Sequence, residues 1–228
     1  MTLLSICNNV AGEVGIDPLS IVVGNSSDDA VKLLRYANKA GLALALSFDW
    51  ADLIQERTFT AIAGETQTGI LPANFGRFVP ETFWNRSVPN RVVGPVSSPE
   101  WANLKAAPYT GDVRKFIRRA SSLQFIPVFA GGEALAFEYQ SKNWCQSAAL
   151  VGQSAWVADT DTAIIDEELI TMLVAVMYTD DKGLPLGRLS AELSDRIRVL
   201  QRNQRVSVGT VIAGDIFSSG LHYSGTPF

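Results

Sequence analysis

Residues 166–204 read DEELITMLVAVMYTDDKGLPLGRLSAELSDRIRVLQRNQ, and this stretch predicts two helices joined by a tight break. The first helix spans 166–178 and begins with the acids Asp166, Glu167 and Glu168, of which Asp166 suits the N-cap position. Free N–H groups and the helix dipole favour negative charge at that end. Beyond the acids the segment is apolar on every face, and such a helix must be covered on all sides.

The second helix follows the break at Gly183-Leu184-Pro185, and its apolar residues form a single stripe. The stripe consists of Leu186, Leu189, Leu193, Ile197 and Leu200. One amphipathic partner covers only one side of the helix at 166–178. Further helices, or other subunits, are therefore expected to cover the rest.

Two more helices are expected near the N-terminus. One spans 2–14, where apolar residues recur at spacings of three and four. The other begins at a cap within 26–29 and runs through Phe48, and its pattern allows an extension to Glu56. Small residues between Ala37 and Ala45 would allow a neighbouring helix to approach closely. Four helices are enough to enclose the apolar one.

From Thr58 onward the pattern changes to short β-rich segments punctuated by glycine, proline and asparagine. The clearest strands are expected at 113–118, 123–128 and 134–141, with Gly131-Gly132 as a hairpin turn between the last two. A β-rich block thus lies inside a helical frame. This order predicts an α+β fold, a bundle of about four helices with a β-rich insertion.

The chain is accordingly divided into four parts. These are the N-terminal helices (1–57), the β-rich insertion (58–158), the C-terminal helical pair (159–204) and an extended C-terminal tail (205–228). The tail carries two charges, four glycines and ten apolar residues. Disordered tails are usually charged and poor in aromatic residues. We therefore expect this tail to dock on its own domain or on a neighbouring protein, and its deletion from 206 onward to weaken partner binding without unfolding the rest.

The apolar tail residues expected to make that contact are Val208, Ile212, Phe217, Leu221, Tyr223 and Phe228.

Composition and charge limit the function classes. The net charge of −4 argues against a dedicated nucleic-acid binder, which usually shows a basic footprint. The middle of the chain, 61–145, is nevertheless basic, with nine Lys/Arg against six Asp/Glu. The longest apolar runs fall well short of the roughly 20 residues that span a bilayer, and the N-terminus does not match a signal peptide. We expect a protein folded in a cytoplasm, with no membrane partner.

Motifs for catalysis and cofactor binding are missing from the sequence. It contains no P-loop, no dinucleotide-binding glycine pattern and no zinc-protease motif, and its one histidine, His222, lies in the tail. Cys7 and Cys145 are expected to be buried free thiols. The acids at Asp159 and Asp161 lack the remaining features of a calcium loop. No enzyme activity, metal or cofactor is therefore expected.

Two groups of side chains in the β-rich block are candidates for contacts with other molecules. Four tryptophans lie in or beside this block, namely Trp84, Trp101, Trp144 and Trp156. They either belong to a core or subunit interface or, if exposed, stack on sugars, and the first is favoured. The basic cluster consists of Arg114, Lys115, Arg118 and Arg119, for which a solvated strand face is the simplest interpretation. An acidic neighbour or passing DNA is the next alternative.

Several of these stretches together resemble the head-to-tail adaptor family of tailed bacteriophages, which includes the tail tubular A, or gatekeeper, proteins of short-tailed phages. The likeness runs from about residue 3 to about residue 204, in one order along the chain. The segments that carry it are Ala37-Asn38-Lys39-Ala40-Gly41, Phe48-Asp49-Trp50, Thr82-Phe83-Trp84-Asn85-Arg86, Val93-Gly94-Pro95-Val96-Ser97, Glu100-Trp101, the run FEYQSKNW at 137–144 and Ala158-Asp159-Thr160-Asp161-Thr162.

The resemblance implies a structural virion protein with a helical bundle and a β-rich insertion. Copies would form a ring of about twelve, closed by a cyclic interface. The ring would join the portal protein to the tail tube or nozzle, with genomic DNA passing through without sequence-specific binding. The tail would contact the portal, and Trp84, Arg86, Trp101, Arg118 and Arg119 would lie at subunit or tail interfaces.

Two other functions remain open on the residues alone. The first is a carbohydrate- or receptor-binding tail module that uses exposed tryptophans. The second is a glycan hydrolase with two catalytic carboxylates, which no pair of acids in the sequence marks out.

Overall fold

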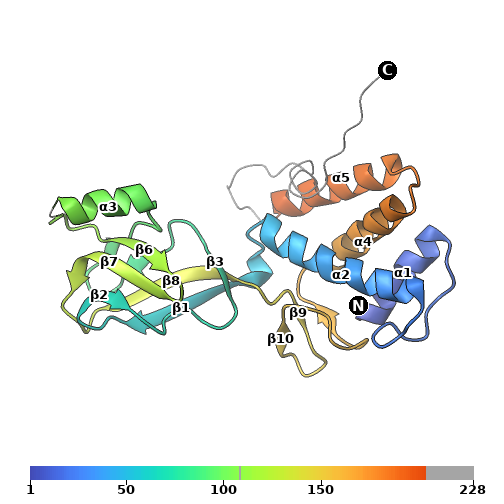
Figure 1. Ribbon diagram of the computed structural model, residues 1–228, viewed down its shortest axis with the longest axis horizontal. Coiled ribbons are helices and arrows are strands. Elements are labelled where there is room, and N and C mark those ends of the chain that lie inside the picture. The colour runs from blue at the N-terminus through green and yellow to red at the C-terminus, as the bar shows by residue number, and fades with distance from the viewer. Residues whose placement is uncertain (108, 204–228) are drawn as a thin grey trace, which may run out of the picture. The chain divides into compact units, whose positions relative to one another are not determined.

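The computed structural model describes residues 1–107 and 109–203 (Figure 1). Within them the chain forms five α-helices and three antiparallel sheets, which confirms the α+β class. It divides into two compact units. Among the described residues, the helical unit comprises Met1–Leu53 and residues 142–203, and the β unit lies within Ile54–Ser141.

Helix α4 (Glu167–Asp181) is the centre of the helical unit (Figure 1). The Asp166 side chain caps it by accepting a hydrogen bond of 2.8 Å from the backbone N–H of Leu169. Nine of its residues are buried, on every face of the helix. Helices α1 (Leu3–Val14), α2 (Asp28–Ser47) and α5 (Gly187–Asn203) all contact it, as its uniformly apolar sequence requires.

Helix α5 contributes the predicted stripe, with Leu193 and Ile197 buried and Leu200 partly buried against the same core. Helices α1 and α2 both begin at hydroxyl caps, Thr2 and Ser27. The expected four-helix arrangement around the apolar helix is therefore present in the helical unit.

Helix α2 ends at Ser47, so the expected extension to Glu56 is wrong. Phe48 is extended, and the Trp50 indole Nε1 turns back to donate a 2.6 Å hydrogen bond to the Leu44 carbonyl oxygen. This bond satisfies one of the carbonyl groups that a helix leaves free at its C-terminal end. A short 3₁₀ turn, η1 (Ala51–Leu53), then leads into strand β1 (Ile54–Thr60).

Residues 142–158 belong to the helical unit, whereas the sequence pattern predicted them to be part of the β-rich insertion. Trp144 and Trp156 are buried in the helical core and pack edge to face, with ring centroids 5.1 Å apart. A small sheet with the order β10-β9-β11 lies in the same unit and consists of β9 (Cys145–Gln146), β10 (Gly152–Gln153) and β11 (Thr162–Ala163). The unit borders at 53/54 and 141/142 thus differ from the expected 57/58 and 158/159.

The β unit contains two sheets. The larger has the order β1-β8-β4-β5, with β3 also paired to β8, and the smaller has the order β2-β7-β6. The strands other than β1 are β2 (Gly64–Gln67), β3 (Phe75–Phe78), β4 (Trp84–Asn85), β5 (Asn90–Arg91), β6 (Lys115–Arg119), β7 (Ser122–Phe129) and β8 (Ala134–Ser141). Helix α3 (Ser98–Ala106), which begins at the Ser97 cap, completes this unit.

Strands β7 and β8 lie in different sheets, so the expected hairpin at Gly131-Gly132 is wrong. The Gly132 N–H donates to the Ala61 carbonyl, and the Ala61 N–H donates to the Glu133 carbonyl, at 2.9 and 2.8 Å. Both glycines have positive φ, which glycine adopts without strain. The two glycines therefore redirect the chain from one sheet to the other.

The β unit has an aromatic core in which Phe78, Phe83, Phe116, Phe125 and Phe137 form a chain of ring contacts. The rings meet mostly edge to face or tilted, with centroids 5.1–5.8 Å apart, which is the favourable range for aromatic pairs. Trp101 lies in a separate small cluster with Ile117 and Ile126. The β unit therefore has its own hydrophobic core.

Candidate functional site

Strand β4 and the turn that follows it present two of the predicted interface residues at the surface of the β unit. The Trp84 side chain is 44% exposed, and Arg86 forms an exposed ion pair with Glu56 on β1. Asn85, between them, is buried. Because side chains alternate along a strand, burying Asn85 directs Trp84 and Arg86 to the opposite face.

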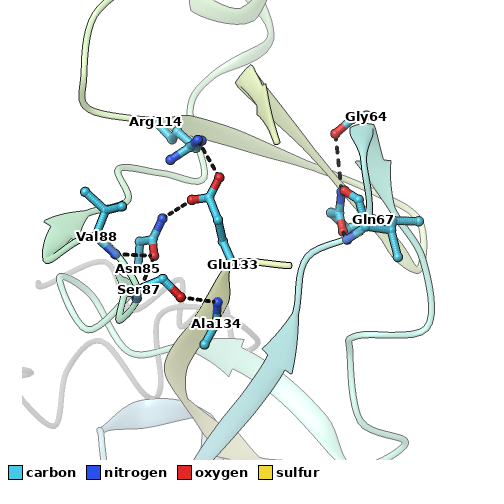
Figure 2. A network of polar contacts seen from close by, with 9 residues as sticks. Gly64, Gln67, Asn85, Ser87, Val88, Arg114, Glu133 and Ala134 are labelled. Carbon is cyan, nitrogen blue, oxygen red and sulfur yellow. Dashed lines mark hydrogen bonds and ion pairs between the residues drawn. The ribbon is translucent and has the colours of Figure 1, made fainter. Parts of the chain in front are cut away.

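Asn85 is held by a polar network that joins β4 to the start of β8 (Figure 2). Its Nδ2 donates to Glu133 Oε2, and its Oδ1 accepts the backbone N–H groups of Ser87 and Val88 at 3.0 and 3.1 Å. The Ser87 hydroxyl accepts a 2.8 Å hydrogen bond from the Ala134 N–H. The turn after β4 is thus fixed by side chains rather than by sheet pairing alone.

Glu133 also forms an ion pair with Arg114, at 2.9 Å between Oε1 and Nη2, and the two side chains are only 17% and 19% exposed. The Arg114 guanidinium lies over the Phe129 ring, 4.4 Å from its centroid. A charge that is nearly buried requires a partner of opposite sign and further hydrogen bonds. Asn85 and Arg114 together meet that requirement for Glu133.

A second polar contact in Figure 2 fixes the β1–β2 corner. The buried Gln67 side chain accepts from the Ile62 N–H at 2.8 Å and donates to the carbonyl groups of Ile62 and Gly64. These bonds hold the chain between β1 and β2.

The four residues of the basic cluster have different environments. Arg114 is paired with Glu133, and Lys115 is paired with Glu100 at 2.8 Å. Arg118 and Arg119 are exposed at the end of β6 and form no ion pair within the described residues. The Arg118 guanidinium stacks over the Phe75 ring at 5.0 Å and donates to the Ala120 carbonyl. Of these four residues, Arg118 and Arg119 are therefore the two that are exposed without an ionic partner among the described residues.

Trp101 is only 5% exposed, so its indole is part of the β unit's interior. Lys105 lies over this ring at 5.8 Å and is itself paired with Glu65. The placement does not bring Trp101 to the surface beside Trp84. An exposed tryptophan pair for sugar stacking is therefore not formed by these two residues.

The helical unit carries an exposed apolar surface on α2. Leu42 and Leu46 are 48% and 60% exposed, and they are neighbours on the helix because they are four residues apart. The opposite face of the same helix, with Leu33, Ala37 and Leu44, is fully buried. We call the pair Leu42 and Leu46 the α2 leucine patch.

The thiols and acids of the helical unit have structural roles. Burial raises the pKa of the Cys7 thiol to about 12, with the nearby Asp159 as a smaller cause. Asp159 accepts the backbone N–H groups of Val22 and Val23, and Asp161 accepts those of residues 157 and 158. The described residues contain no cluster of three or more His, Cys, Asp or Glu residues that could hold a metal ion.

Burial raises the pKa of the Cys145 thiol to about 12 as well, and the Asp161 charge adds to that effect. A low-pKa thiolate is the form that acts as a nucleophile. Neither cysteine is thus suited to nucleophilic catalysis. Among the described helices, none combines the length and apolar character needed to cross a membrane.

The pKa of the Glu13 carboxyl is raised, first by partial burial and then by the charge of Glu192, while Arg188 acts in the opposite direction. A raised carboxyl pKa is one property of a general acid. Glu13 is, however, exposed near the end of α1. The raised pKa of Glu13 bears on the hydrolase alternative, as does the surface pocket that Glu13 and Glu168 both line.

The six tail residues predicted to bind a partner, His222 and the rest of 204–228 lie outside the described residues. Within the described part, Trp84 and Arg86 are exposed, and their role at an interface stays a prediction. The sequence interpretation missed Asn85, Glu133 and Arg114 as the group that positions them. The deciding contact joins Asn85 and Glu133, which are 48 residues apart. No local pattern in the sequence indicates that pairing.

Comparison with known proteins gives no family assignment. The chain matches no protein-family model, and no curated protein sequence matches it.

Proposed function

We propose that this chain is a structural head-to-tail adaptor of a tailed bacteriophage virion, without enzymatic activity. Copies assemble into a ring, of about twelve by the resemblance of the sequence, that joins the portal protein to the tail tube or nozzle. Genomic DNA passes through the ring during ejection without being read. The proposal rests on the sequence resemblance together with the character of the exposed surfaces.

The observation that carries the proposal is the α2 leucine patch. A single exposed leucine is ordinary, whereas Leu42 and Leu46 are neighbours on one face of α2 and together present a larger apolar surface. Apolar side chains flanked by polar ones are typical of protein interfaces. Lys39 and Arg35, both exposed, stand on the same side of α2 toward its N-terminus. We therefore assign the patch to contact between neighbouring copies of this chain.

The β unit supports the same proposal in a different way. Trp84 and Arg86 belong to residue types enriched where proteins meet, and the buried network around Glu133 fixes them before any partner arrives. Preorganised contacts lose less conformational entropy on binding. We assign Trp84 and Arg86 to a contact with a neighbouring subunit or with the tail.

The proposal is tested by measuring the mass of the purified protein by light scattering, alone and with portal protein, and by negative-stain imaging of any rings. Leu46→Asp should abolish or weaken the ring, because it places a charge in an interface, while circular dichroism of the isolated chain stays unchanged. Val199→Asp is the matched control, since Val199 is similarly exposed but is flanked by charged residues on α5. A chain that remains monomeric even with portal protein would contradict the proposal.

A glycan-binding module is the second candidate, because the ring of Trp84 is exposed beside Arg86. Aromatic faces and charged groups together are able to hold a sugar. Binding on a glycan array, lost on Trp84→Ala without loss of fold, would favour this candidate. Trp101→Ala serves as the comparison, because Trp101 is buried and its loss should act on stability instead.

A further inference from the structure

The α2 leucine patch is one end of a longer exposed row on helix α2. Val31, Arg35, Lys39, Leu42 and Leu46 are all exposed, and they follow one another at spacings of three or four residues. Such residues are neighbours on a helix surface, so the five form one row about 22 Å long. We call them the α2 row. Neither of its two cations forms an ion pair with a described residue.

The same helical unit carries a surface pocket between α1 and α4, two helices that pack together (Figure 1). Its volume is about 530 Å³, and its lining includes Met1, Asn9, Gly12, Glu13 and Glu168. We call it the α1–α4 pocket. None of its lining residues belongs to α2. One copy of the chain is therefore able to present the α2 row and the α1–α4 pocket at the same time.

The α1–α4 pocket is acidic. Glu168 pairs with Arg196 at 2.8 Å, but its side chain stays 55% exposed, and Glu13 forms no ion pair with a described residue. Partial burial and then the charge of Glu192 raise the pKa of the Glu13 carboxyl, and the opposite effect of Arg188 does not cancel them. Within a single copy, the Glu13 carboxylate thus lacks a cation that compensates its charge.

Apolar and charged groups follow each other at the same spacing on the two surfaces. In the pocket, Met1 is 45% exposed and its sulfur accepts a 3.3 Å hydrogen bond from Asn9, while Glu13 lies one helical turn beyond Asn9 on α1. On the α2 row, Lys39 lies one turn from Leu42. When the two surfaces meet, Leu42 is able to contact Met1 while Lys39 reaches Glu13.

We propose that the α2 row of one copy binds in the α1–α4 pocket of the next copy, with Lys39 paired to Glu13 and Leu42 packed against Met1. Different helices supply the two surfaces, so the contact is head to tail, which is the type that closes a ring when repeated. Opposite charges fix the register of such an interface. This inference rests on the adaptor proposal and adds to it the surface that receives the α2 leucine patch.

The test measures assembly of the full-length protein by light scattering, alone and with portal protein. Glu13→Lys and Lys39→Glu should each weaken assembly roughly tenfold, because each places like charges opposite one another. An equimolar mixture of the two variants should assemble again, since every contact in an alternating ring then joins opposite charges. The double variant Glu13→Lys/Lys39→Glu should also assemble, for the same reason.

Arg198→Glu is the matched control, because Arg198 is 68% exposed on α5 and belongs to neither surface. It should assemble as the unchanged chain does. If a charge-reversal variant does not fold by circular dichroism, Glu13→Gln and Lys39→Gln replace it, and each should weaken assembly roughly threefold.

An unchanged chain that assembles while both folded single variants assemble equally well would overturn this inference and leave the adaptor proposal standing. So would a mixture of the two charge-reversal variants that stays unassembled. An unchanged chain that stays monomeric even with portal protein would overturn both.

Discussion

The Cα of Gly41 on α2 lies against the indole ring of Trp144, so that a Cβ added to Gly41 would fall well inside 3.0 Å of three ring carbons. Trp144 is fully buried and its Nε1 donates a 3.0 Å hydrogen bond to the Ser154 carbonyl, which leaves the ring little freedom to move. The small residues of α2 were expected to admit a neighbouring helix. At Gly41 they admit a tryptophan from the segment after the β unit.

We expect Gly41→Ala to destabilise the helical unit by about 1–3 kcal/mol, because overpacking a dense core forces side chains out of their preferred rotamers. This loss outweighs the helix propensity that alanine gains over glycine, about 1 kcal/mol. Urea unfolding followed by circular dichroism measures the difference. Gly12→Ala on α1 is the matched control, since nothing lies within 4 Å of its added Cβ, and it should be neutral or stabilising.

The central helix was the most predictable part of the fold, because its signals are local. An acidic start followed by uninterrupted apolar residues determines both the cap at Asp166 and the burial of α4 on all faces. The end of α2 could not be predicted in this way. It depends on the Trp50 indole reaching back to Leu44, a contact that the helical pattern of the sequence does not encode.

We expect Leu173→Asp to prevent folding of the helical unit. Leu173 is fully buried in α4, and an unpaired charge there costs several kcal/mol, a large fraction of the stability of a domain. Loss of the helical signal in circular dichroism and of soluble protein would show this. Leu173→Met nearly conserves the volume and should cost less than about 1.5 kcal/mol. A folded Leu173→Asp protein would contradict the central role of α4.

The candidate site was predictable only in part. Trp84 and Arg86 stand out by residue type, whereas Arg114 was interpreted as a solvated cation and is instead paired with Glu133. Arg114 and Asn85 both contact Glu133, which is 19 residues from Arg114 and 48 residues from Asn85 in the sequence. Long-range pairing of this kind depends on sheet register and on the crossing at Gly131-Gly132, neither of which the sequence pattern indicated correctly.

We expect Glu133→Gln to destabilise the β unit by about 1–3 kcal/mol, since it leaves the Arg114 guanidinium nearly buried without an opposite charge. Urea unfolding, fitted with a separate transition for each unit, measures the change. Glu81→Gln is the control, because Glu81 is 73% exposed in its pair with Arg91 and such pairs contribute at most about 1 kcal/mol. Equal effects of the two variants would show that the network does not stabilise the turn after β4.

A contact between α2 and the end of α4 should contribute stability to the folded protein at neutral pH and lose that contribution at acid pH. The Tyr178 hydroxyl donates a 2.5 Å hydrogen bond to the Asp29 carboxylate and lowers the pKa of that carboxyl, with Lys182 as a smaller cause. A lowered pKa stabilises the folded state above the ordinary carboxyl pKa of 3.8, and the gain is lost as the pH falls below it. Tyr178→Phe should therefore cost about 1 kcal/mol at pH 7 and less at pH 3. A cost independent of pH would assign the effect to packing alone.

The two thiols provide the corresponding alkaline prediction. Burial raises the pKa of both Cys7 and Cys145 from 9.0 to about 12. A raised pKa means that the stabilisation is complete below pH 9 and is lost as the pH rises from there toward 12, because the unfolded chain releases its thiol protons first. At pH 8 neither thiol should be alkylated by iodoacetamide in the folded protein, whereas both should react in urea. Ser26 is exposed, so the variant Ser26→Cys should react in the folded protein and serves as the control. Labelling is read by mass spectrometry. If Cys7 or Cys145 were labelled in the folded protein at a rate comparable to that of the Ser26→Cys control, the helical core would be open to reagent at that cysteine.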